Sequence, residues 1–199
     1  MKSTQRLFFL LVFLIWSSGC APMSVNPLSD PATAEIDQRL IGVWYPQDTE
    51  GGRGYVHFVE SKDKGWLDVV IIDYKKSGGV GIETFQMFTT KLGQRYFMNI
   101  IERPLTEEEK KNEDEKYHLI FYEFLDGNLS FRFMTAELVA QSIERGELKG
   151  TAVKTKWTKD VTITDTTENL ARYLLQSDIN KLFPQGLGDK PVILKKLIH

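Results

Sequence analysis

The amino-acid sequence predicts a mainly β domain built as an antiparallel meander, with one or two helices in its C-terminal third. Between residues 40 and 134, runs rich in β-branched and aromatic residues alternate with short turn signals rich in Gly, Asp, Asn and Lys. No helical pattern separates these runs, which favours antiparallel pairing because parallel strands need long crossovers. After residue 134 the apolar residues take up helical spacing.

The individual elements follow from these patterns. Seven strands are expected first, at residues 40–45, 55–61, 66–74, 82–91, 95–103, 117–125 and 129–134. One helix is expected over residues 135–144, and a second behind Asp165-Thr-Thr-Glu168, which is shaped like a capping box. A strand pair is expected between the helices, and a final strand after them, at residues 152–157, 161–164 and 192–197.

Several of the expected strands are apolar on both faces. In the run at 66–74, Val70 and Ile72 lie on one face, and Val69 and Ile71 lie on the other. A sheet with one face in water alternates apolar and polar residues, and this run does not. Both faces must therefore be covered, by closure into a barrel, by helices or by a ligand.

The connection between two of these strands is highly charged. Residues 106–116 hold nine charges in eleven positions, six acidic and three basic. Removing so many charges from water would cost more than local pairing returns. The segment is therefore expected to be a solvent-exposed insertion.

The amino terminus has the features of an export signal. Lys2 and Arg6 precede an uninterrupted apolar run of ten residues at 7–16. That run is too short to cross a bilayer, which takes about 20 apolar residues, but it suits the hydrophobic core of a signal peptide. Residues 1–19 are therefore expected to be a signal peptide.

The end of this signal resembles the lipobox of bacterial lipoproteins, in which small residues precede a cysteine. Ser18, Gly19 and Cys20 match that pattern, whereas Ser17 stands where the family prefers an aliphatic residue. The resemblance implies cleavage before Cys20, a diacylglyceryl thioether on its sulfur and a fatty acyl group, typically palmitate, on the new amino group. It also implies a cell-envelope location. Ala21 after the cysteine favours the outer membrane facing the periplasm, with the inner membrane as the alternative.

Residues 20–36 are expected to form the lipidated N-terminus and a flexible tether. Pro22, Pro27 and Pro31 stand among small polar residues there, which disfavours helix and favours a semi-extended chain. Residues 37–199 are then expected to form one mainly β domain.

The start of that domain, Leu40-Ile-Gly42-Val-Trp44, resembles the first motif of lipocalins, in which Gly-x-Trp lies on the first strand and the Trp closes one end of the barrel. The resemblance covers only these residues, and the later lipocalin motifs have no counterpart. It implies that the meander closes into a lipocalin-like barrel. Trp44 is then expected to be buried at one end, near the late helix or its flanking loops.

The residue types that carry catalysis or metal binding are sparse. His57, His118 and His199 form no ligand pair, and the chain contains no Gly-x-Ser-x-Gly. Cys20 is the only cysteine, so no disulfide can form within the chain and the one thiol is assigned to the lipid. The sequence therefore predicts no catalytic residue, no metal and no cofactor, and a protein that is not an enzyme.

Charge argues against one further class of partner. Loss of residues 1–19 removes two cations and no anion, so the formal net charge falls from −2 to −4. Nucleic acid selects basic surfaces and is not an expected partner. Glu102 and Glu123 could meet across strands, although each is expected to face solvent or pair with an Arg.

Two functions fit these expectations. The first is a membrane-anchored binding module whose barrel holds an apolar or amphipathic small molecule. The alternative is a scaffold or accessory protein that fills its barrel with its own side chains and binds another envelope protein. The sequence identifies Cys20 as the lipid attachment site and identifies no ligand-binding residue.

Overall fold

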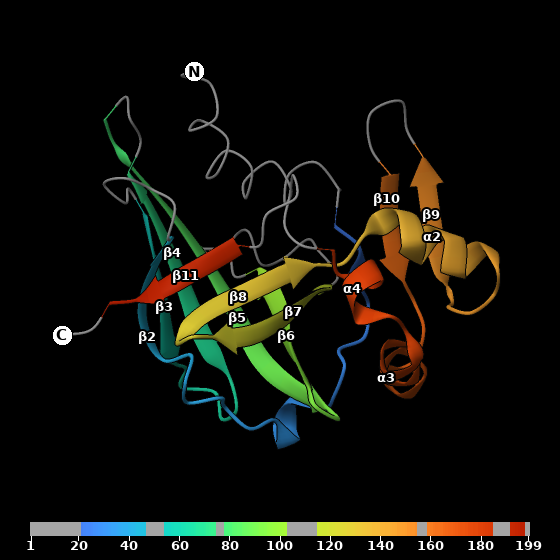
Figure 1. The fold of residues 1–199 in the computed structure, drawn as a ribbon, viewed down its shortest axis with the longest axis horizontal. Helices are drawn as coiled ribbons and strands as arrows, with labels where there is room; N and C mark the ends of the chain where they lie inside the picture. The colour runs from blue at the N-terminus through green and yellow to red at the C-terminus, as the bar shows by residue number, and fades with distance from the viewer. Residues whose placement is uncertain are drawn as a thin grey trace.

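Eight strands close into an antiparallel barrel in the computed structural model, which describes residues 21–46, 54–74, 78–102, 115–154, 159–184 and 192–197 (Figure 1). The barrel strands are β2 (Gly42–Pro46), β3 (Gly54–Glu60), β4 (Leu67–Tyr74), β5 (Val80–Leu92), β6 (Arg95–Glu102), β7 (Tyr117–Leu125), β8 (Asn128–Phe133) and β11 (Val192–Lys196). Strands β2 to β8 pair in chain order, and β11 pairs with both β8 and β2 to complete the ring. The predicted meander, its closure and the late helices are confirmed.

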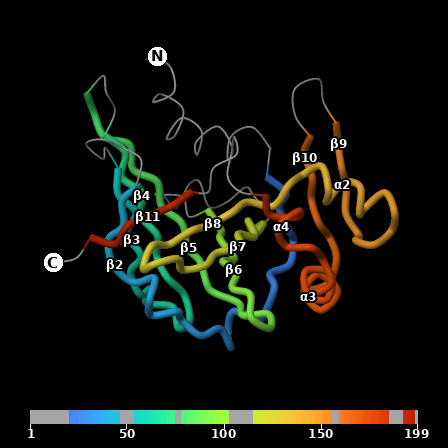
Figure 2. Tube along the Cα trace, viewed as in Figure 1, coloured from blue at the N-terminus to red at the C-terminus, as the bar shows by residue number. Residues whose placement is uncertain are grey.

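Between β8 and β11 the chain builds a lobe beside the barrel, drawn in orange in Figure 2. We use "lobe" for residues 135–183. Both expected helices and the strand pair are present, and a further short helix follows them. The side chain of Thr166, rather than Asp165, accepts the N-terminal hydrogen bond of the second helix, from the Asn169 amide. The lobe elements are α2 (Ala136–Glu144), β9 (Gly150–Lys154), β10 (Lys159–Ile163), α3 (Thr167–Gln176) and α4 (Ile179–Leu182).

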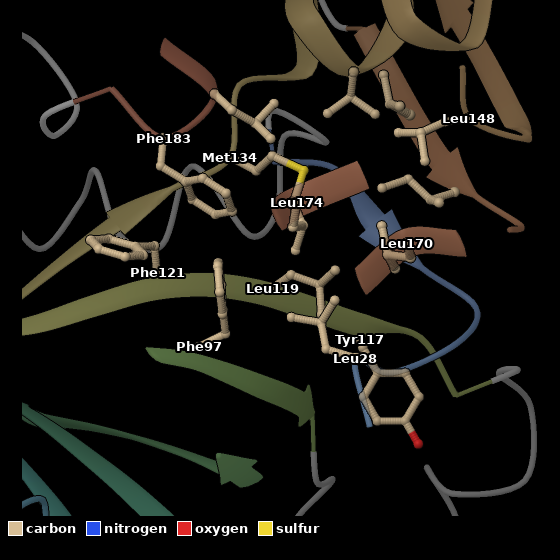
Figure 3. Packing of buried hydrophobic residues seen from close by; sticks show 14 of the residues in the cluster. Leu28, Phe97, Tyr117, Leu119, Phe121, Met134, Leu148, Leu170, Leu174 and Phe183 are labelled. Carbon is tan, nitrogen blue, oxygen red and sulfur yellow. The ribbon is translucent and has the colours of Figure 1, made fainter. Parts of the chain in front are cut away.

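Two hydrophobic clusters explain why the strands are apolar on both faces. Along β6, Met98 and Ile100 point into the barrel, while Phe97 and Ile101 point outward against the lobe. Closure into a barrel covers one face, and the lobe covers the other (Figure 3). We call the inner cluster the barrel core and the outer one the lobe core.

Residues 21–36 pack against the folded domain, which differs from the expected flexible tether. Strand β1 (Met23–Ser24) pairs with β7 on one side and β10 on the other, and a 3-10 turn, η2, covers Pro31–Thr33. Leu28 is 2% exposed in the lobe core, and its N–H donates to Asn99 Oδ1 at 2.8 Å. The prolines exclude helix but allow this extended path, whose backbone groups find partners on the domain.

Three expectations concern residues that the structure does not describe. The signal at 1–19 and Cys20 lie outside the described residues, as does the charged segment 106–116 apart from Glu115 and Lys116. Across the described ranges, no helix is both long enough and apolar enough to cross a membrane.

Candidate functional site

The two ends of the barrel are built differently. In an up-and-down barrel the connections alternate between the ends, so the β3–β4, β5–β6 and β7–β8 connections share one end. Residues 35–41 lie across that end: Thr89 on β5 donates to the Glu35 carbonyl at 2.7 Å, and Leu40 is fully buried. We call this the closed end, and we call the opposite one, where β4 leads to β5 and β6 to β7, the mouth end.

Trp44 fills the closed end. It is 1% exposed, and its indole Nε1–H donates to the Leu40 carbonyl at 2.7 Å. Its ring lies 6.1 Å from that of Phe124 within the barrel core. Burial of Trp44 at one end of the barrel is thus confirmed. Its neighbour there is the segment before β2, and not the late helix or its flanking loops as expected, because the late helices pack on the lobe core.

The glycine of the Gly-x-Trp motif has a steric role. Gly42 adopts φ of 130°, and a Cβ there would lie 2.9 Å from Lys196 Cε. The Lys196 ammonium in turn lies 5.3 Å from the centre of the Trp44 ring and donates to the Arg39 carbonyl at 3.1 Å. Glycine therefore permits the positive φ at this position and leaves room for the Lys196 side chain beside Trp44.

A polar network ties residues 37–39 to the barrel. Arg39 binds Asp37 through two hydrogen bonds of 2.8 and 2.6 Å, and the Tyr122 hydroxyl donates to Asp37 at 2.9 Å. Burial alone would raise the pKa of Asp37, but these hydrogen bonds outweigh it and hold the pKa below its ordinary value. The Arg39 guanidinium also stacks over Phe124, 4.5 Å from the ring centre. The closed end is therefore sealed by packing and by a charged pair.

Inward-facing apolar side chains keep some exposed surface at both ends of the barrel. In the closed half, Leu67 and Met87 are fully buried, and the partly exposed rings of Tyr96 and Phe124 lie under the Arg39 guanidinium. In the mouth half, four apolar side chains of the same inward-facing set are only partly buried, namely Val56, Ile71, Phe131 and Phe133. Apolar side chains on the inside of a barrel that keep exposed surface are the lining expected of a pocket.

Carboxylates lie closer to the mouth end than the inward-facing apolar side chains of their own strands do. Asp73 follows Ile71 on the inward face of β4, and Glu83 precedes Phe85 on the inward face of β5. Burial raises the pKa of Glu83, and the nearby charges of Glu102 and Asp73 raise it further. Glu102 and Asp73 are therefore close enough to repel Glu83 near the mouth end.

Sequence reasoning missed Asp73 and Glu83, although the signal was present. Glu83 stands two and four residues before Phe85 and Met87, so a period of two places its side chain on the barrel interior. Glu102 and Glu123 do not meet across strands, because their side chains lie on opposite faces of the barrel sheet. Glu123 instead binds Arg132 on the outer face at 3.0 Å, as the expectation of an Arg partner allowed.

The histidines do not come together. His118 lies on β7, where burial lowers its pKa to about 4, so its ring is neutral at pH 7. His57 lies on the outer face of β3, opposite Val70, and His199 is outside the described residues. In the part of the chain that the structure describes, no three His, Cys, Asp or Glu residues are placed to hold a metal ion.

The lobe, outside the barrel, carries a cleft of about 740 Å³ between α2 and α3, lined mainly by polar and charged side chains. Its acidic groups are already bonded: Glu147 to Arg145 at 2.7 Å, Asp165 to the Lys149 amide at 3.0 Å, and Asp178 to the Asn180 amide at 3.1 Å. This arrangement is typical of a solvated groove, so the mouth half of the barrel is the stronger candidate site.

The lipid attachment predicted at Cys20 lies one residue before the first described residue, Ala21. Comparison of the chain with protein-family models, with curated proteins and with solved structures finds no match, so no residue role carries over from another protein.

Proposed function

We propose that the protein is a lipid-anchored lipoprotein of the bacterial envelope whose barrel binds an apolar or amphipathic small molecule without catalysing a reaction. One observation carries the binding part of the proposal. At the closed end the partly exposed rings of Tyr96 and Phe124 are covered by Arg39, whereas four partly exposed apolar side chains on the inside of the mouth half, Val56, Ile71, Phe131 and Phe133, have no such charged cover among the residues that the structure describes. This difference favours a ligand that enters from the mouth end.

The lining suggests how such a ligand would lie. An apolar group would contact Val56, Ile71 and the rings of Phe131 and Phe133. A polar group on the same molecule would remain near the mouth end, where Asp73 and Glu83 meet solvent. This order of apolar and polar surface favours an amphipathic ligand over a purely apolar one.

The binding proposal is tested by native mass spectrometry of the protein purified from its host. We expect a retained small molecule in the wild type and its loss in Ile71→Gln, which places an amide in the lining. Ile72→Gln is the matched control, because the neighbouring side chain lies on the outer face of the same strand. Equal retention by both variants would place the ligand elsewhere.

The anchor is supported by the lipobox resemblance and by the single cysteine. Two acyl chains hold a protein firmly on a membrane, whereas one holds it only marginally. Cys20→Ser is expected to abolish incorporation of labelled palmitate and to move the protein from the detergent phase to the aqueous phase. A wild-type protein that incorporates no labelled fatty acid contradicts the anchor. The outer membrane facing the periplasm is the proposed location.

A scaffold function is the alternative, and β9 is the observation that favours it. Within the described residues β9 pairs only with β10, and its residues 151–154 are exposed. An open strand edge can accept a strand from another protein. If Ala152→Pro abolished capture of an envelope partner and left small-molecule retention unchanged, the scaffold function would be preferred.

A further inference from the structure

The docked N-terminal segment fixes where an acylated Cys20 would lie. Met23 pairs with His118, near the mouth end of β7, and with Thr162 of β10. Just after β1, the Val25 N–H donates to the Ile163 carbonyl at 2.9 Å. A lipid on Cys20 would therefore be attached three residues before Met23, the first residue of a strand that is paired on both sides. Consecutive Cα atoms are about 3.8 Å apart, so the lipid must lie near the start of β1.

This position removes most of the freedom that a tether would give. The sixteen residues 21–36 could reach roughly 50 Å from the domain as an extended chain. Instead they run along the domain, and the Asn26 side-chain amide donates to the Asp165 carbonyl at 2.9 Å. The membrane would then lie against one particular face of the domain.

That face is the one at the top of Figure 1. The beginning of the blue N-terminal segment, the end of β9 with the start of β10, and the end of β4 with the start of β5 all lie on that side. The turn η2, which accompanies the closed end, lies at the bottom. A flat surface touching the start of β1 would thus meet the mouth end and not the closed end.

The same side carries exposed apolar side chains. Val80 and Ile82 are each 53% exposed on the outer face of β5, and Tyr74, directly opposite Val80, is 44% exposed. On β9, Val153 is 58% exposed. Aliphatic side chains with a tyrosine suit the membrane interface. The net charge of −4 gives no general attraction to anionic headgroups, so the contacts available to this face are its apolar side chains and the local cations Lys154 and Lys159.

We propose that the domain rests on the lipid bilayer through this face, with Tyr74, Val80, Ile82 and Val153 in contact with the lipid interface. The mouth end of the barrel then faces the bilayer. This inference rests on the proposed acylation of Cys20.

The test uses the full-length acylated protein in phosphatidylcholine vesicles, some of whose lipids carry brominated acyl chains. Cys20 is the only cysteine, so once it is acylated an introduced cysteine is the only free thiol and can carry an NBD fluorophore. Val80→Cys and Val153→Cys report on the proposed face. Val59→Cys and Leu125→Cys are controls near the closed end with similar exposure, 51% and 49% against 53% and 58%.

We expect the brominated lipids to cause loss of emission at positions 80 and 153 and to leave positions 59 and 125 unchanged. Equal loss at all four positions, or greater loss at 59 and 125, overturns the orientation while leaving the anchor intact. The NBD groups at positions 80 and 153 could instead be unquenched in vesicles and yet shielded from solvent in native membranes. That result would mean that this face binds a protein and not lipid. Wild-type protein that takes up no palmitate and whose Cys20 reacts with maleimide overturns the proposed function itself, and the orientation with it.

Discussion

The barrel core and the lobe core use the same sheet wall but recruit their residues differently. The barrel core takes alternate residues from eight strands, seven of which follow one another along the chain. The lobe core gathers distant segments: Leu28 from the N-terminal segment, Phe97 and Phe121 from the outer face of the barrel, and Leu170 and Phe183 from the lobe (Figure 3). A local sequence pattern of period two can therefore specify the barrel core. The lobe core forms only when segments far apart in the sequence pack on the outer face of the barrel.

The largest loss of stability is expected when the largest fully buried side chain of the barrel core is removed. Trp44→Ala is expected to lower the free energy of unfolding by about 3–5 kcal/mol, the usual cost of deleting a large buried aromatic. The loss includes the indole hydrogen bond to Leu40. Urea denaturation followed by circular dichroism measures it. A change near zero would mean that the closed end does not depend on Trp44.

The lobe core is tested through its most distant contributor. Leu28→Ala is expected to cost about 2–3 kcal/mol, because the side chain is 2% exposed and packs with residues from the barrel and the lobe. Val25→Ala, at a position 42% exposed in the same segment, is the control and should change stability little. If Leu28→Ala behaved like its control in thermal unfolding, residues 21–36 would be a tether after all.

The smallest effect is expected at the mouth end, where the barrel core meets solvent. Burial, Glu102 and Asp73 raise the pKa of Glu83, so the folded state holds this proton more tightly than the unfolded state does. Stability therefore falls as pH rises from about 4.3, the ordinary glutamate value, through the raised pKa. Glu83→Gln should raise the melting temperature at pH 7 and leave it unchanged at pH 3.

Glu35→Gln, at an exposed carboxylate in the segment that covers the closed end, is the control for that measurement. It should leave the melting temperature unchanged at both values of pH. A Glu83→Gln variant that was less stable than wild type at pH 7 would show that the carboxylate is held by a favourable partner rather than repelled.

The candidate site was only partly visible in the sequence. The alternation of Val69 and Ile71 with Val70 and Ile72 predicted that both faces of this strand are covered, but it could not say which set points inward. Val69 and Ile71 face the barrel core, whereas Val70 and Ile72 on the outer face are only partly buried and belong to neither core. The role of Asp73 and Glu83 could be inferred only from the pairing of β4 with β5, which brings the two carboxylates together at the mouth end.

By itself the sequence determined the order of the strands, their antiparallel pairing and the late helices. Each of these depends on side-chain period, turn residues or local hydrogen bonding, which act over a few residues. The burial of Trp44 was implied by the resemblance of Gly42-Val-Trp44 to the first lipocalin motif. Tertiary structure alone decided that residues 21–36 pack on the domain and that Leu28 meets Asn99 across 71 residues. Prolines and small polar residues look the same in a free tether and in a docked strand, because what distinguishes the two is the availability of a partner, and the partner is made by the rest of the fold.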